Sequence, residues 1–326
     1  MTQVQLFDKI INISLFRSTP GIGVAGAGAA NKAGSYASVT CPPTGRKPTI
    51  RLSGEMVSTF TLTRLELRIT NFETDVPLSQ YTMANGGHSS VVAGYAGSLK
   101  GAFYGEILNA YQELPGPDGV TMFEFLVGSF YNWTTKTIKV NYGGGVPLRS
   151  VLSDVAGALG LSLLYYADAR LVTPFNGIHH NGLAKDLLLK IMKMFRSQGY
   201  NGDWSGLMLR PDGQNLIATN RDLGTGLTYQ LDYVSMVNHT AAGFEIQAPW
   251  VPSIRPDDYI QIDPRYFRQG IGGAFVAVQG TIFQVIRVSF DFCTTDSTNM
   301  MTLTTVDRAS IPQIHAPSIP MQKVVG

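Results

Sequence analysis

Cysteine is scarce in this chain, and so is charge. The 326 residues include two cysteines, Cys41 and Cys293, which lie far apart in the sequence. A framework of disulfide bonds is therefore not expected, and the natural environment is a reducing compartment. Charged residues make up 15% of the chain, whereas an ordinary soluble domain has about 25%. Because subunit interfaces are depleted of charge, this shortage favours an obligate assembly, although β proteins rich in glycine and threonine can also be poor in charge.

A strong electric field and a long apolar run are missing as well. The formal net charge of +2 is too small to gather nucleic acid on an outer surface, so contact with nucleic acid would be passive or local. No window approaches the ~20 apolar residues that span a bilayer. The apolar run at 10–16 has neither a basic leader nor a small-residue cleavage site. We therefore expect no membrane span and a protein made and kept in the cytoplasm.

Motifs for catalysis and cofactor binding are also missing. The sequence has no Gly-x-Ser-x-Gly elbow, no P-loop and no HExxH. Residues 21–26 match the letters of the dinucleotide fingerprint, but glycines rather than an amphipathic helix follow, and the next acidic residue is Glu55. A dinucleotide site needs a helix to begin there, so a mobile surface loop is predicted. We expect no enzyme and no catalytic, cofactor-binding or metal-binding residues.

Two small groups of polar residues could suggest a metal or acid–base chemistry. His179 and His180 are adjacent, so on an extended segment they point to opposite faces, as polar surface residues or residues at the start of a helix. Asp257, Asp258 and Asp263 belong to a Pro-Asp stretch. Such a stretch predicts a turn into a strand, because a calcium loop needs more oxygen ligands at alternate spacing.

The sequence contains one strand-turn-strand pattern twice, at 101–127 and at 280–306. In each copy a glycine opens a strand, a turn rich in polar or turn-forming residues follows, and a second strand completes a hairpin. The predicted equivalents, in order, are Phe103, Ile107 and Tyr111 with Ile282, Ile286 and Phe290. Each hairpin is typical of a small twisted sheet or barrel. Three copies of the chain would present six similar modules around one axis, which predicts a ring-forming protein.

The middle of the chain changes to a helical period. Residues 147–160 place their apolar side chains on one face, with proline at the first turn and glycine at the exit. A second helix is predicted from about 183 to 198, capped by Asn181 and ended by Gly199. Short apolar runs flank both helices. The sequence therefore predicts a small α/β insert of two strand-helix-strand units.

At this point the chain resembles the baseplate hub proteins of tailed phages, particularly contractile-tailed phages. The resemblance covers about residues 50–306. It rests on the layout of these stretches: 94–95, the strand at 101–109, the Gly-Pro-Asp turn at 116–118, the helix at 147–160 after 139–141, the segment 243–263 and the strand at 280–285.

The resemblance implies a fold and a set of partners. Hubs of this kind have two similar β-barrel domains with an α/β insert, and three subunits form a ring of six barrels that matches the sixfold tail tube. The ring encloses a passage for DNA, grips the central spike or puncturing protein, and has no catalytic residues. A near-neutral chain agrees with this passage, because DNA must slide through the ring rather than be held by it. The implied partners are a homotrimer, the tail tube protein, the spike and other baseplate proteins, in a virion tail baseplate assembled in the host cytoplasm.

The expected fold class is accordingly β-rich α+β, with two similar small β-barrel domains and an inserted α/β region. The expected domains are a first barrel at 1–140 with a Gly- and Pro-rich loop at 17–48, the insert at 141–227, a second barrel at 228–309, and an extended proline-containing tail at 310–326. We expect the loop and the tail to contact the tube, the spike or neighbouring baseplate proteins.

Two other functions stay open. A carbohydrate-binding or cell-wall-active tail component would need paired carboxylates or an aromatic platform, and Trp133, Trp204 and Trp250 are scattered along the chain. Another ring-forming tail protein, such as a distal tail protein or tube initiator, would have the same patterns. Because interface strands and core strands both alternate apolar residues, the sequence does not distinguish interface residues from core residues. It also does not tell which barrel would face the tube.

Overall fold

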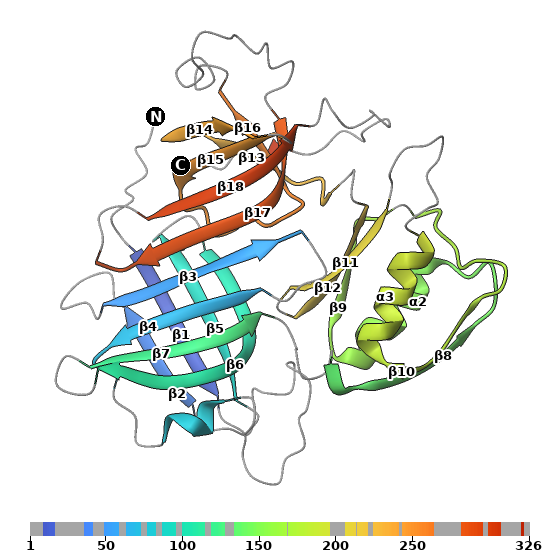
Figure 1. Ribbon diagram of the computed structural model, residues 1–326, viewed down its shortest axis with the longest axis horizontal. Coiled ribbons are helices and arrows are strands. Elements are labelled where there is room, and N and C mark those ends of the chain that lie inside the picture. The colour runs from blue at the N-terminus through green and yellow to red at the C-terminus, as the bar shows by residue number, and fades with distance from the viewer. Residues whose placement is uncertain are drawn as a thin grey trace.

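A large sheet and a smaller α/β insert make up the protein (Figure 1). The computed structural model describes residues 9–16, 36–41, 49–58, 63–72, 77–82, 87–95, 100–114, 119–127, 134–167, 169–195, 206–212, 214–220, 224–240, 243–263, 282–295, 299–307 and 321–322. The loop at 21–26 and most of the tail at 310–326 lie outside these residues.

Within the described residues the large sheet has fourteen strands, which belong to two sections of the chain. The amino-terminal section contains β1 (Lys9–Phe16), β2 (Tyr36–Cys41), β3 (Ile50–Val57), β4 (Arg64–Thr70), the short 3-10 helix η2 (Leu78–Tyr81), β5 (His88–Tyr95), β6 (Lys100–Leu114) and β7 (Val120–Val127). The carboxy-terminal section contains β13 (Thr228–Leu231), β14 (Met236–His239), β15 (Phe244–Pro249), β16 (Tyr259–Ile262), β17 (Ile282–Cys293), β18 (Met300–Asp307) and β19 (Met321–Gln322).

The two sections have the same strand order. Neighbouring strands run β3-β4-β7-β6-β5-β1 in the first section and β14-β15-β18-β17-β16-β13 in the second. The hairpins β6–β7 and β17–β18 are both antiparallel, and the longer strand of each has an extra residue at a bulge, Leu108 in β6 and Ile286 in β17. Strand β6 has a second register shift near its end, between Gln112 and Leu114. One difference is that β1 pairs with β5 antiparallel whereas β13 pairs with β16 parallel. The duplication predicted from the two hairpins is therefore present in the strand order.

The predicted residue equivalence is wrong by one position. The sequence comparison placed Ile107 opposite Ile286, but the two bulges align Leu108 with Ile286. A slip of one residue exchanges the two faces of a strand. Consistent with this, Ile107 and Val285, which the corrected register aligns, are both fully buried. The extra residue at a bulge leaves no mark in a simple alternation of apolar residues.

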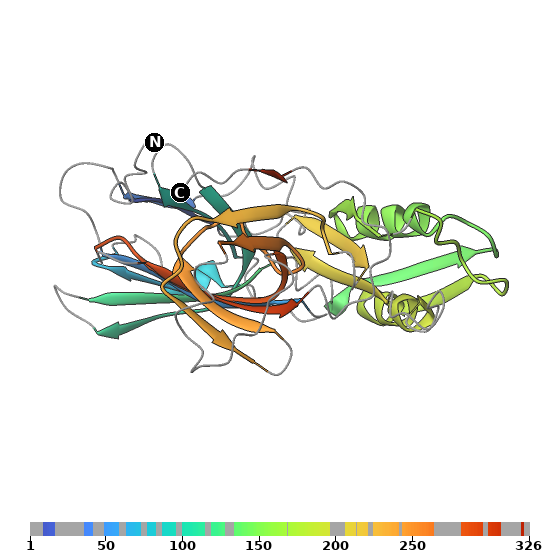
Figure 2. The same cartoon turned by 90° about the horizontal axis from the view of Figure 1, so that it is seen from above.

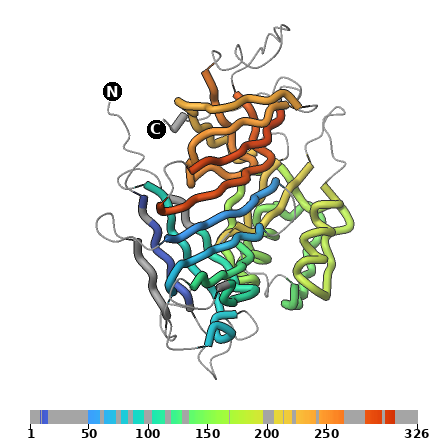
Figure 3. Tube along the Cα trace, turned by 60° about the vertical axis from the view of Figure 1, so that its left-hand side comes forward, coloured from blue at the N-terminus to red at the C-terminus, as the bar shows by residue number. Residues whose placement is uncertain are grey.

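The prediction of a β-rich α+β chain with two β-barrel domains is also wrong. Residues 287–293 of β17 pair with residues 51–57 of β3, so the sections join edge to edge in one open sheet (Figure 3). The described strands of this sheet form no closed barrel, and its path ends at β14 and β2. Hairpin patterns in a sequence specify which neighbouring strands pair. Whether a sheet closes into a barrel depends on which strands distant in the sequence pair, and a local pattern does not specify this.

A stack of aromatic rings joins the cores of the two sections. Phe103 of β6 stacks on Phe290 of β17 with ring centroids 5.6 Å apart, and Trp250 stacks on Phe290 at 5.1 Å. The Trp250 ring also contacts Phe292 at 4.7 Å. Buried residues from both sections accordingly form one continuous cluster.

The insert has its own core. Its elements are β8 (Thr137–Tyr142), α2 (Leu148–Leu159), β9 (Ser162–Tyr165), β10 (Ile178–Leu183), α3 (Ala184–Phe195), β11 (Leu207–Asp212) and β12 (Asn215–Asn220). Strand β8 pairs with β10, and β12 lies between β9 and β11. Both predicted helices are confirmed, and Gly160 ends α2 with a φ of 75°. The predicted cap Asn181 instead lies within β10, opposite Lys139. Figure 2 shows the insert extending from one side of the sheet.

Among the described residues, no helix has the length and apolar character needed to cross a bilayer.

Replacing Phe290 with alanine tests the shared aromatic core. We expect Phe290→Ala to lower the free energy of unfolding by about 3–5 kcal/mol, because the ring contacts both Phe103 and Trp250. Urea denaturation at one protein concentration measures the loss, since association also adds to stability. The matched control is Phe175→Ala, because Phe175 is 96% exposed, and its effect should stay within about 0.5 kcal/mol. Equal losses in the two variants would contradict a core at Phe290.

Candidate functional site

A cluster of buried charges lies where the insert meets the large sheet. We call Arg210, Asp212, Arg255, Asp257 and Asp258 the junction cluster. Arg210 and Asp212 are in β11 of the insert, and the other three precede β16 of the carboxy-terminal section. Arg210 is 7% exposed, Asp257 1% and Asp258 2%. Charges this deeply buried need partners, because desolvation of an unpaired ion costs several kcal/mol.

The arginines and aspartates pair reciprocally across the junction. Arg210 Nε lies 3.3 Å from Asp257 Oδ2, and Arg255 Nε lies 3.7 Å from Asp212 Oδ2. Arg210 also donates a hydrogen bond of 2.7 Å from Nη2 to the carbonyl of Pro256. The guanidinium of Arg210 therefore ties β11 to the turn that leads into β16.

Backbone and hydroxyl groups hold the two neighbouring carboxylates. Asp258 Oδ2 accepts a 2.8 Å hydrogen bond from the backbone N–H of Arg255, and Asp258 Oδ1 accepts one from the hydroxyl of Thr225. Asp257 accepts a hydrogen bond from the hydroxyl of Ser58, in the amino-terminal section. The backbone of Asp257 is left-handed, with a φ of 73°. The predicted turn into a strand is confirmed, but the pairing of its carboxylates with Arg210 was not foreseen.

A signal for this pairing was present in the sequence. The tripeptide Arg-Pro-Asp occurs at 210–212 and again at 255–257. In the structure the arginine of each copy lies against the aspartate of the other. Two copies of a short, oppositely charged motif with a rigid proline between the charges indicate a reciprocal ion pair, although sequence alone does not say that the copies meet.

Burial shifts the protonation of Asp258. Desolvation raises the pKa of Asp258 from 3.8 to about 7, against the opposing effects of the hydrogen bonds from Thr225 and the Arg255 backbone and of the charges of Arg210 and Arg255. The cluster has two arginines and three aspartates. The neutral form of Asp258 therefore gives it equal numbers of positive and negative charges.

The partner of β17 changes at the same place. Residues 282–284 of β17 pair with β16, and residues 287–293 pair with β3. Between them, the carbonyl of the bulged Ile286 accepts a 2.8 Å hydrogen bond from the backbone N–H of Ser58, and Asp257 N–H donates to the carbonyl of Val285 at 2.7 Å. The bulge, the change of strand partner and the junction cluster thus form one structural unit.

The equivalent part of β6 has a strand partner on one side only. Residues 100–106 of β6 pair with β5, and β7 pairs along the other side through to Leu114. Among the described strands, none pairs with residues 109–114 on the side where β3 would lie in the other section. Of the strands that the structure describes, only β15 pairs with β14. Figure 1 shows β6 and β14 at opposite edges of the face that contains β3, β4, β17 and β18.

The remaining predicted site residues have structural surroundings. His179 Nε2 lies 3.1 Å from the carbonyl of Asn176, and His180 Nε2 lies 3.0 Å from the carbonyl of Leu183, beside the start of α3. This confirms the interpretation of both as polar residues near a helix start. In the described part of the chain, no three His, Cys, Asp or Glu residues gather closely enough to hold a metal.

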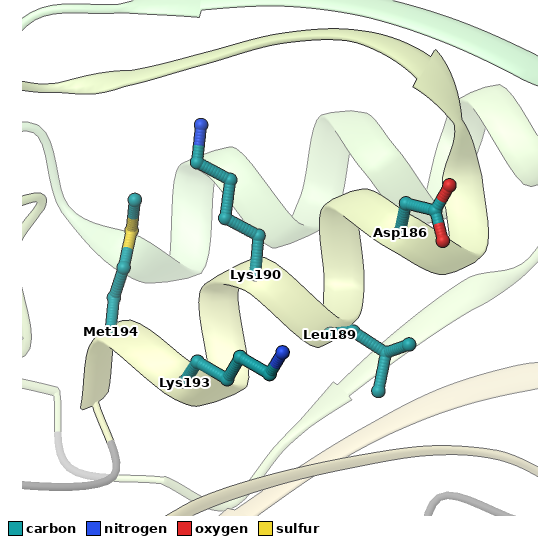
Figure 4. A pocket seen from close by; sticks show the side chains of 5 residues that line it. All are labelled: Asp186, Leu189, Lys190, Lys193 and Met194. Carbon is teal, nitrogen blue, oxygen red and sulfur yellow. The ribbon is translucent and has the colours of Figure 1, made fainter.

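A shallow hollow lies on the outer face of α3 (Figure 4). Its lining consists of Asp186, Leu189, Lys190, Lys193 and Met194. It therefore offers one carboxylate and no aromatic ring. Trp250 is buried in the core, and Trp133 and Trp204 lie outside the described residues. These residues do not build the paired carboxylates or aromatic platform that carbohydrate chemistry would need.

Comparisons with known proteins agree on the fold. No family model matches the chain, and no curated protein matches it. Among solved structures, a tail protein of Neisseria meningitidis MC58 has a TM-score of 0.53 at 7% identity, covering 91% of this chain and 97% of its own. A type VI secretion component of Escherichia coli, described as structurally similar to the phage T4 tail proteins gp27 and gp5, has a TM-score of 0.53 at 12% identity, covering 85% of this chain and 79% of its own.

A third similar structure is the 43 kDa tail protein of prophage MuSo2 from Shewanella oneidensis. It has a TM-score of 0.50 at 10% identity and covers 82% of this chain and 100% of its own. At identities this low, the TM-scores establish a common fold and nothing more. The expected resemblance to phage baseplate proteins is confirmed at this level: the chain has the fold of phage tail proteins and of a related secretion component.

Replacing Asp258 with asparagine tests the electrostatics of the junction cluster. Because the pKa of Asp258 is raised from 3.8 to about 7, ionisation favours the unfolded chain, so the wild type loses stability as pH rises from about 4 to about 7. Asp258→Asn removes this loss. Relative to the wild type, the variant should gain up to about 4 kcal/mol of unfolding free energy between pH 4 and pH 8.

Urea titrations at several pH values measure this difference directly. The matched control is Asp291→Asn, since Asp291 is exposed and pairs with Arg51 at the surface. Its difference from the wild type should stay small across the same range, because solvent screens exposed pairs. A stability difference for Asp258→Asn that does not change with pH would show that the buried carboxyl is not the titrating group.

Proposed function

We propose that this chain is a structural protein of a phage-type tail, a baseplate hub. Three copies would form a ring of pseudo-sixfold geometry that joins the tail tube to the central spike and encloses the DNA passage. The observation that carries the proposal is the strand order found twice in one chain. Three copies would offer six equivalent sections around one axis. The common fold with phage tail proteins supports the setting in a virion tail.

The proposed partners are the tail tube protein, the spike and other baseplate proteins, and the proposed location is the tail baseplate. We also propose that the chain has no catalytic activity. In support, Asp257 and Asp258 of the junction cluster are buried in an ion pair and hydrogen bonds, where a substrate does not reach them.

The contact between the two sections suggests how the ring would close. Inside one chain, residues 287–293 of β17 pair with β3 of the other section. The equivalent segment of β6 is 109–114, and the equivalent of β3 is β14. If the same contact recurs between chains, residues 109–114 of one copy pair antiparallel with β14 of the next, and three such contacts close the ring.

The side chains on these two edges suit pairing better than protection from it. Natural edge strands are usually blocked by lysine or proline, and also by short length, which applies to the four-residue β14. Neither edge contains lysine or proline: the residues are Asn109, Ala110, Tyr111, Gln112, Glu113 and Leu114 on β6, and Met236, Val237, Asn238 and His239 on β14. Tyr111, 41% exposed, would be covered by the neighbouring copy.

Cysteine pairs test this contact and its register. Aligning the sections at their bulges transfers the pair Phe290 and Gly54 to Gln112 and His239. Opposed residues on antiparallel strands are close enough for a disulfide bond. We therefore expect Gln112→Cys with His239→Cys to give covalent trimers on mild oxidation, visible by non-reducing denaturing electrophoresis.

Three controls make the result specific. Each single cysteine variant should give no trimer, which also accounts for Cys41 and Cys293. Gln112→Cys with Met236→Cys, displaced along β14, should cross-link far less. Light scattering should give three times the 35.3 kDa of one chain, and electron microscopy should show a ring with six similar densities. A monomer at all concentrations would contradict the hub, whereas a trimer without the specific cross-link would contradict only the proposed edge contact.

A hub also has to be distinguished from another ring of the tail. Binding of the tail tube protein to one face of the ring and of the spike to the other would support the hub. Binding of the tube alone would favour a distal tail or tube-initiation ring.

A further inference from the structure

One aromatic side chain of the insert is almost completely exposed. Phe175 is 96% exposed, and Val172, close to it in the chain, is 45% exposed. A phenylalanine presents some 150–250 Å² of largely apolar surface, so leaving it in water forgoes a large hydrophobic gain. The apolar side chains of α2 and α3 are mostly buried in the core of the insert. Among the described residues of the insert, Phe175 is therefore by far the most exposed large apolar side chain.

The loop that carries Phe175, residues 171–177, is fixed by hydrogen bonds to residues 143–146. The hydroxyl of Thr173 donates to the carbonyl of Gly143 at 2.7 Å and accepts from the N–H of Val146 at 2.9 Å. The backbone N–H of Thr173 donates to the carbonyl of Val146 at 2.8 Å. Thr173 itself is 2% exposed. The exposed ring thus projects from a well-anchored base.

The turn around Phe175 is fixed as well. The N–H of Gly177 donates to the carbonyl of Pro174 at 2.7 Å. Gly177 has a φ of 69°, and a Cβ there would come within 2.1 Å of the Tyr142 carbonyl. His179 supports the following residue through Nε2, 3.1 Å from the carbonyl of Asn176. A side chain presented from a fixed turn loses little conformational freedom on binding, which favours recognition.

The loop lies at the end of the insert that is farthest from the large sheet. Strand β8 runs away from that sheet in Figures 1 and 2, and residues 143–146 directly follow β8. Because loop 171–177 is bonded to these residues, it shares their position. The junction cluster attaches the opposite end of the insert to the large sheet. The exposed ring of Phe175 therefore lies at the free end of an attached unit.

The charge of the insert indicates what the ring would meet. Residues 134–220 contain nine Lys and Arg against five Asp and Glu, whereas the whole chain has a net charge of +2. Arg149 is exposed in the first turn of α2, and its neighbour Leu148 donates to the carbonyl of Leu171 at 2.8 Å. Two such basic inserts would repel one another, so a second copy of the chain is disfavoured as the occupant.

We propose that loop 171–177 is a docking element for a different protein, with Phe175 inserting into an apolar pocket whose rim carries carboxylates. Aromatic residues and arginine are the residue types enriched in interface hot spots. The contact is separate from the ring edges of β6 and β14 and does not depend on them.

The partner can be identified by placing the photo-reactive residue p-benzoylphenylalanine at position 175. The full-length chain is produced in the cells that naturally express it, irradiated in its native assembly, and the cross-linked peptides are mapped by mass spectrometry. We expect one partner protein, cross-linked within a segment that combines apolar residues with Asp or Glu. A cross-link to a second copy of this chain, or none in the intact assembly, would overturn the proposal.

Binding measurements with the purified partner then test the anchor. Phe175→Ala should weaken binding about 30-fold, as expected for a hot-spot aromatic, while Tyr233→Ala, which removes a ring that is 59% exposed on another surface, should leave it unchanged. Phe175→Ala should also keep the wild-type unfolding midpoint and oligomer mass. A changed oligomer mass would assign the loop to the ring instead, and equal affinities would reject the anchor.

Membrane binding is the outcome to separate from protein docking. Co-sedimentation with phosphatidylglycerol vesicles should not differ between the wild type and Phe175→Ala. Retention by vesicles that depends on Phe175 would overturn a protein partner.

Discussion

The change of partner along β17 is the constraint on which the rest of the structure depends. One strand pairs with β16 at its start and with β3 at its end, and the bulge at Ile286 separates the two parts. The second pairing turns two repeated sections into one sheet. The ion pairs across it, Arg51 with Asp291 and Arg287 with Glu55, are exposed and contribute little. The stacked rings of Phe103, Phe290 and Trp250 beneath the sheet supply the larger stabilisation, because their area leaves water.

What could be predicted from the sequence was local. The two hairpins and the two helices follow from alternation and helical periodicity, and the turn at Asp257 follows from its proline. The bulges were missed because one inserted residue resembles a small irregularity in an alternating strand. The two-barrel prediction was wrong because it assumed that each repeat closes on itself, whereas the edge of one repeat pairs with the other. That choice depends on residues more than two hundred positions apart.

The junction cluster shows a different limit of sequence reasoning. Asp257 and Asp258 look like ordinary turn residues, since Pro-Asp turns are usually at the surface. Their burial is explained by the fold, which brings the Arg-Pro-Asp tripeptide of the insert, including Arg210, against the tripeptide that contains Asp257. Replacing buried ion pairs by apolar residues is often neutral or stabilising, so net stability alone does not explain the cluster. Its geometry agrees with a fixed attachment, because Arg210 of β11 contacts both Asp257 and the carbonyl of Pro256.

A fixed attachment gives the repeated sheet and the insert distinct roles. The repeat supplies equivalent edges, which suit symmetric self-association, and these edges are nearly uncharged. The insert occurs once per chain, has nine Lys and Arg against five Asp and Glu while the rest of the chain has a small excess of acidic residues, and contains its own core. Three copies in a ring would therefore show sixfold similarity where the sections meet and only threefold symmetry where the inserts project. On the proposed function, three such chains would match a sixfold tail tube without a change of conformation, because the pseudo-sixfold and the threefold symmetry come from different parts of one polypeptide.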